Sequence, residues 1–89
     1  MYIHLGEDVV VNQKSIVGIF DLETSTISKI TREYLSAAEK KGQVINVSTQ
    51  IPTSFVVCKI NGETTVYTAQ ISSQTLSKRA GFIDNISLK

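Results

Sequence analysis

The sequence has few of the residues that build disulfides, metal centres and membrane spans. Among its 89 residues are one cysteine, Cys58, and one histidine, His4, so no disulfide within the chain and no zinc site of paired histidines and cysteines is expected. No apolar run approaches the roughly 20 residues that cross a bilayer. The first residues also lack the basic segment and apolar core of a secretion signal. We therefore expect a cytoplasmic protein with no metal, no cofactor and no membrane contact.

Catalytic motifs are also lacking. A Ser-His-Asp arrangement would have to use His4, and no nucleophile-elbow motif supports it. Glu7 and Asp8 are adjacent at a turn, where carboxylates usually face water, and no glycine-rich phosphate loop is present. Cys58 follows the apolar residues 55–57, which is typical of a small buried hydrophobe, with a reactive thiol as the alternative. The sequence predicts no enzyme and no small-molecule substrate.

The most apolar continuous stretch is the first one, Tyr2 to Glu23. Runs at Tyr2–Leu5 and Val9–Val11 predict a hairpin in which Gly6 takes a positive φ. A longer strand is predicted over Ser15–Leu22, with apolar residues on both of its faces. Both faces should then be covered by protein, and a partner subunit is one source of that cover.

The rest of the chain predicts further strands and two helices. An amphipathic helix of about four to five turns begins at the capping residues 24–26 and ends before Gly42. A short helix over 74–80 is capped by Ser72 or Ser73 and ends at Gly81. Strands are predicted at 43–49, 54–60 and 64–71, and the last two flank the turn sequence Asn61-Gly62. The apolar residues of the tail predict docking rather than fraying: Phe82, Ile83, Ile86 and Leu88.

These elements predict one domain over residues 1–89 of the α+β class. We expect a mostly antiparallel sheet of about five to six strands, with one long amphipathic helix and one short C-terminal helix. The only proline, Pro52, falls between two predicted strands, where it interrupts no ladder.

Charge is unevenly distributed along the chain. Residues 1–24 carry four acidic and one basic side chain, a net −3, whereas residues 25–89 carry eight basic and four acidic ones, a net +4. The basic part is either a weak footprint for a polyanion or an ordinary solvated surface. With a net charge of +1, a lone protomer should hold DNA poorly at physiological salt.

Several short motifs resemble the RemA/RemB family of bacterial extracellular matrix regulatory proteins. They are Tyr2-Ile3-His4-Leu5-Gly6 with Asp8, Ile16-Val17-Gly18-Ile19-Phe20-Asp21, and further on Ser72-Ser73, Thr75-Leu76 and Lys78-Arg79-Ala80. The resemblance covers about residues 1–82 and leaves the tail, 83–89, outside it. It implies a small cytoplasmic transcription regulator that binds DNA upstream of biofilm-matrix operons and joins its copies into a ring, with a RemA-type paralogue as a further partner.

The sequence departs from that family at a group of arginines. RemA-type members carry an arginine cluster before the strand that corresponds to 55–60, where this chain has Ile51, Pro52 and Ser54. They also carry an arginine just before the strand at 16–20, and Lys14 lies at or one residue from that position. Lysine keeps the charge but not the bidentate fork of a guanidinium.

Two functions follow from these observations. The first is an oligomeric, DNA-associated regulator that contacts mainly the phosphate backbone, with five candidate contact residues: Lys14, Lys78, Arg79, Lys29 and Arg32. For the last four, the competing interpretation is that they cap helix ends or lie on a solvated helix face. The second function is an oligomeric protein-interaction module with little direct DNA binding, which the missing arginines favour.

Overall fold

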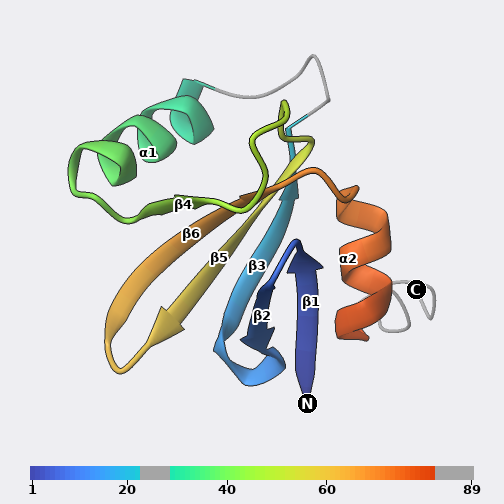
Figure 1. Cartoon of the computed structure of the whole chain (residues 1–89). Helices are drawn as coiled ribbons and strands as arrows, with labels where there is room; N and C mark the ends of the chain where they lie inside the picture. The colour runs from blue at the N-terminus through green and yellow to red at the C-terminus, as the bar shows by residue number, and fades with distance from the viewer. Residues whose placement is uncertain (23–28, 82–89) are drawn as a thin grey trace, which may run out of the picture.

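The computed structural model describes residues 1–22 and 29–81. Within them, an N-terminal pair of strands is followed by a single-turn 3-10 helix, a further strand and a helix, and then by three more strands and a second helix (Figure 1). The elements are β1 (Tyr2–Gly6), β2 (Val9–Asn12), η1 (Gln13–Ser15), β3 (Ile16–Asp21), α1 (Lys29–Lys40), β4 (Val44–Asn46), β5 (Ser54–Ile60), β6 (Glu63–Ala69) and α2 (Ser73–Ala80).

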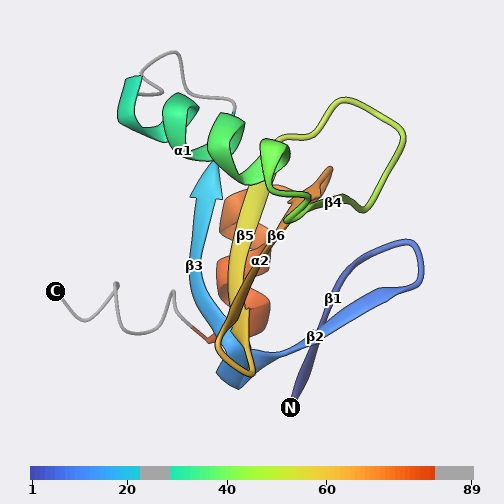
Figure 2. The same ribbon diagram turned by 90° about the vertical axis from the view of Figure 1, so that its left-hand side faces the viewer.

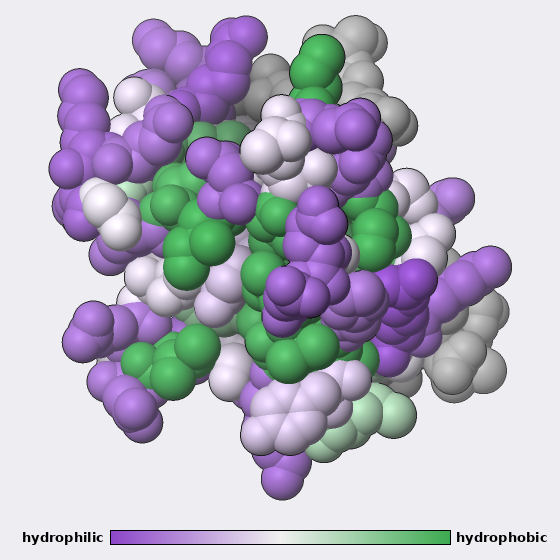
Figure 3. All heavy atoms as spheres, in the orientation of Figure 1, coloured by the Kyte–Doolittle hydropathy of each residue, from purple (hydrophilic) through white to green (hydrophobic). Residues whose placement is uncertain are grey.

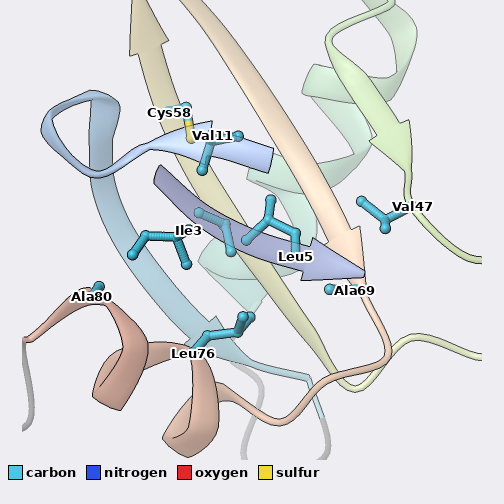
Figure 4. Packing of buried hydrophobic residues seen from close by; sticks show 9 residues of the cluster. Ile3, Leu5, Val11, Val47, Cys58, Ala69, Leu76 and Ala80 are labelled. Atoms are coloured by element: carbon cyan, nitrogen blue, oxygen red, sulfur yellow. The ribbon is translucent and has the colours of Figure 1, made fainter. Parts of the chain in front are cut away.

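These strands form two sheets, which corrects the predicted single sheet. β1 and β2 pair only with each other, as an antiparallel hairpin, and the other four strands form a sheet in the order β3-β5-β6-β4. β4 runs parallel to β6, so the larger sheet is mixed. The hairpin separates because its apolar side chains pack across a face of the larger sheet instead of extending that sheet at β3: Ile3, Leu5 and Val11 join one core with Val56 and Cys58 (Figure 4).

α1 is also shorter than predicted. It has 12 described helical residues, a little over three turns, and is not the long helix expected from the sequence. The capping residues predicted at 24–26 lie outside the described residues, as does the tail from residue 82 onward. α2 agrees with its prediction: Ser72 Oγ accepts a hydrogen bond from the Thr75 N–H, and Gly81 ends the helix at a φ of 81°.

The local turn predictions are confirmed. Gly6 has a φ of 130° at the tip of the β1–β2 hairpin. Asn61 and Gly62 have φ values of 53° and 82°, which is the positive pair that a tight hairpin between β5 and β6 requires.

The two helices lie on opposite faces of the four-stranded sheet (Figures 1 and 2). On one face, α2 and the hairpin enclose the larger core, where Leu76 of α2 is completely buried. On the other face, α1 covers a smaller core through Ala38, which packs with Phe55, Val57 and Val66. α1 leaves part of that face open: Phe20 of β3, whose ring stacks on Phe55, is still 46% exposed.

Candidate functional site

Three of the five predicted contact residues come together at one end of the molecule. Lys14 lies exposed in η1, and Lys78 and Arg79 lie exposed in the last turn of α2. The Gln13 side chain joins the two elements, because its Nε2 donates a hydrogen bond to the Ala80 carbonyl oxygen. Their separation by more than 60 residues in sequence gives no hint of this proximity.

The other two candidates do not join this group. Lys29 and Arg32 lie exposed in the first turn of α1, which packs on the opposite face of the sheet from α2 (Figure 2). A single surface of one protomer therefore does not present all five side chains.

Arg79 has a structural role in addition to its charge. Its Nη1 donates a hydrogen bond of 2.9 Å to the His4 carbonyl oxygen, which ties the end of α2 to β1. Lys78, one residue earlier, is exposed and adds positive charge near the negative end of the helix dipole. Of the two, Lys78 is the better placed to reach a phosphate.

Lys59 is a further basic residue at the same end, and the sequence interpretation missed it. β3 and β5 are antiparallel with Ile16 opposite Cys58, so the exposed Lys59 lies beside η1. The Asn61-Gly62 turn marks the end of β5, but only the β3–β5 register places that end next to Lys14. We call Lys14, Lys59, Lys78 and Arg79 the basic end.

Acidic residues of the described chain lie mostly elsewhere. Glu7 and Asp8 occupy the β1–β2 turn, and Asp21 is the last residue of β3, at the opposite end of that strand from η1. Glu63, paired with Ile60 at the β5–β6 turn, is the acidic residue near Lys59. The positive charge of the basic end is therefore only partly offset.

The positions of the missing family arginines lie far from the basic end. Residues 51–54 lead into the start of β5, whereas Lys59 and η1 lie at its end. Ile51 is 86% exposed, but Ser54 is completely buried and its Oγ donates a 2.6 Å hydrogen bond to the Ile71 carbonyl oxygen. A charged side chain would be tolerated at Ile51 and not at Ser54.

The N-terminal hairpin presents apolar side chains to solvent. Tyr2 is 70% and Val10 55% exposed, and the strand register places both on the outer face of the hairpin, away from Ile3 and Val11. Figure 3 shows hydrophobic residues at the surface where β1 and β2 lie in Figure 1. We call Tyr2 and Val10 the hairpin patch.

The remaining reactive side chains have structural surroundings. The exposed His4 donates from Nε2 to the Glu7 carbonyl oxygen at 2.6 Å, within the hairpin turn. Cys58 is completely buried, as predicted for a small hydrophobe, and burial raises the pKa of its thiol to about 11.

Residues 1–22 and 29–81 contain no group of three or more side chains arranged to hold a metal ion. No helix in these ranges has the length and apolar character of a membrane span.

The family model described as RemA-like, extracellular matrix regulatory protein A-like, matches residues 2–80. The chain belongs to the RemA-like family. That match runs from β1 to the last residue of α2, so it spans every described element of this RemA-like protein. The chain is also similar to extracellular matrix regulatory protein B of Bacillus subtilis (strain 168), with 42% identity over 86 residues, 97% of this chain and 98% of that protein. Both names are those of regulatory proteins, which agrees with the family predicted from the sequence motifs.

Proposed function

We propose that this RemA-like protein is a non-enzymatic, cytoplasmic regulator of extracellular matrix genes that associates with DNA as an oligomer. The observation that carries the proposal is the basic end, where basic residues of η1, β5 and α2 lie at one end of the four-stranded sheet in a member of a family named for matrix regulation. Lys14, Lys59 and Lys78 are the principal phosphate contacts. Lys29 and Arg32 lie outside this surface and are secondary candidates.

Self-association completes the proposal because one protomer is a weak polyanion binder. The chain has a net charge of only +1, and each phosphate contact contributes modestly at physiological salt. Joining copies raises the effective concentration of their basic ends on one duplex, which increases affinity without new contacts. The hairpin patch supplies apolar surface for the interface between copies. Lys14 follows β2 of the same hairpin by two residues. A RemA-type paralogue is a further partner that would bind through the same interface.

A salt titration tests the DNA contacts. Affinity for duplex DNA, measured by fluorescence anisotropy between about 50 and 200 mM salt, should fall with a log–log slope of roughly −0.9 for each phosphate contact. Lys14→Ala and Lys59→Ala should each make the slope shallower by nearly that amount, on every duplex sequence. The control is Lys41→Ala, which removes the charge of another exposed lysine, just past α1. Equal slopes for all three variants and the unaltered protein would exclude the basic end as the DNA surface.

Sedimentation velocity tests self-association through the hairpin patch. Val10→Glu places a charge in the hairpin patch and should shift the protein toward monomer, whereas Ile51→Glu changes a still more exposed isoleucine outside the patch and should not. A protein that stays monomeric at high concentration before any substitution would end the oligomer proposal.

The second candidate is a protein-interaction module that hardly touches DNA. The exposed Ile51 favours this function. It lies in the connection before β5, where the family resemblance leads one to expect an arginine, and an exposed apolar side chain there suits a protein partner better than DNA. Such a module would show oligomers by sedimentation and no steep salt dependence in the anisotropy titration. The two measurements together therefore separate the two functions.

A further inference from the structure

β3 is an edge strand with an apolar sequence. It lies at the end of the β3-β5-β6-β4 sheet and pairs with β5 along one side, while no strand of the described chain pairs with its other side (Figure 2). Proteins usually protect such an edge with a very short strand, a lysine or a proline, because an open edge is a template for pairing. The opposite edge strand, β4, has only three residues. β3 has six, and the first five are uncharged: Ile16, Val17, Gly18, Ile19 and Phe20.

Most of this edge is regular. The register of β3 against β5 shifts once, between Ile16 and Gly18, and the pairing is unbroken from Gly18 to Asp21. A bulge can turn an edge away from a partner, but this one affects only the start of the strand. The remainder of β3 therefore presents an extended backbone to which a further strand can bind.

The same edge borders an open apolar groove between β3, β5 and α1. The groove encloses about 320 Å³, and most of its lining is aliphatic or aromatic: Val17, Phe20, Phe55, Val57, Ile30 and Tyr34. Val17 is 65% and Phe20 46% exposed, although both belong to a sheet. A strand added beside β3 would cover these two side chains if its own side chains on that face were also apolar.

The charges at the two ends of β3 are self-complementary. The exposed Lys14 of η1 precedes the strand, and Asp21 is its last residue. A second β3 placed parallel to the first would bring like charges together at both ends. An antiparallel one brings Asp21 of each copy to the Lys14 end of the other, and opposite charges across a strand pair stabilise it. Sequence, shape and charge thus make β3 a suitable partner for another β3.

We propose that β3 of a second copy pairs antiparallel with β3, so that two four-stranded sheets join into one across a two-fold axis. Such an interface uses the same surface of both copies. The axis runs perpendicular to the joined sheet, so α1 of both copies lies on the same side, and Val17 and Phe20 of each copy pack against those of the other. This surface is distinct from the hairpin patch, and the inference does not depend on the proposed association with DNA. Of the basic end, pairing engages Lys14 and leaves Lys59 and Lys78 exposed.

Sedimentation equilibrium of the full chain carrying Val10→Glu tests the pairing, because this substitution removes the hairpin patch as an interface. At high concentration the protein should have the mass of two chains, and dilution should dissociate it. Adding Val17→Lys should raise the dissociation constant of the dimer by roughly tenfold or more, because pairing would then bury two unpaired charges. The matched control, Ile51→Lys, adds the same charge at an exposed isoleucine outside β3 and should leave the dissociation constant unchanged.

A mixing experiment tests the antiparallel orientation. In the same background, Lys14→Glu alone and Asp21→Lys alone should each weaken the dimer, because like charges then meet at both ends of the strand pair. An equal mixture of the two variants should restore dimerisation, since every substituted side chain then meets its opposite charge. Circular dichroism checks that each variant stays folded. If Asp21→Lys does not fold, Val17→Lys and Lys14→Glu decide the outcome without it.

Three results would overturn the pairing of β3 with β3. They are a Val10→Glu protein that stays monomeric at the highest concentration, a dimer that Val17→Lys does not weaken, and a mixture that associates no better than its components. The first of these would leave the hairpin interface and the DNA contacts standing, with the β3 edge open to an extended segment of another protein. A salt titration without a slope would reject the DNA contacts and leave the mass measurements unaffected.

Discussion

The buried hydroxyl of Ser54 should contribute measurably to the free energy of unfolding. Its Oγ donates to the Ile71 carbonyl oxygen at 2.6 Å, and no other hydrogen bond to that oxygen is found among the described residues. Ser54→Ala removes the donor and leaves a partly buried carbonyl without it, which costs about 1–3 kcal/mol of unfolding free energy. A domain of this size has roughly 4–13 kcal/mol in total, so the loss is a sizeable share. Each kcal/mol should lower Tm by about 4–8 °C.

The neighbouring residue supplies the control. Thr53 Oγ1 donates to the Gln70 carbonyl oxygen at 2.7 Å, almost the same geometry, but this bond is exposed to solvent. Thr53→Val removes that hydroxyl while keeping the branched shape, and water can replace the bond, so we expect a loss below about 0.5 kcal/mol. Urea unfolding followed by far-UV circular dichroism measures both variants. If Thr53→Val costs as much as Ser54→Ala, burial is not what gives the Ser54 bond its importance.

Three other substitutions test separate features of the structure. Burial raises the pKa of the Cys58 thiol from 9.0 to about 11, so the thiol ionises at lower pH in the unfolded chain than in the folded protein. The free energy of unfolding should therefore fall as pH rises from 9 to 11. In Cys58→Val, urea unfolding should show a weaker dependence of stability on pH over this range. Gly18→Ala would place a Cβ 2.7 Å from the Phe20 ring and should lower the free energy of unfolding by about 1–3 kcal/mol. If contact with the ring is the cause, the same substitution should cost less in a Phe20→Ala background. Ile51→Arg should leave the protein folded, because Ile51 is exposed, whereas Ser54→Arg should prevent folding. Circular dichroism of both variants checks this, and a folded Ser54→Arg variant would contradict the burial assigned to that position.

The sequence predicts local elements well because their signals are local. The hairpin around Gly6, the Asn61-Gly62 turn and the caps of α2 each depend on residues within a few positions of one another. Pairing between distant segments carries no such signal. β4 has three residues, too few for a pattern to reveal that it joins β6 in parallel at the sheet edge.

The site shows the same division between local and distant information. Lys14 and Lys78 are evident from charge and from the family resemblance, but their proximity depends on the contact between Gln13 and Ala80. Lys59 became a candidate only through the β3–β5 register. The register shift between Ile16 and Gly18 is likewise invisible in the sequence, because an alternating pattern assumes an unbroken ladder.

The attachment of α2 to β1 has a consequence for how the protein is made. Arg79 and Ala80 bind residues 75 and 67 positions earlier, and Leu76 fills the core beneath the first hairpin. On the ribosome, β1 and β2 emerge before α2, so the apolar inner face of the hairpin stays exposed until α2 has been synthesised. A nascent chain stalled before α2 would therefore expose the apolar inner face of the hairpin, and exposed apolar surface of this kind favours aggregation.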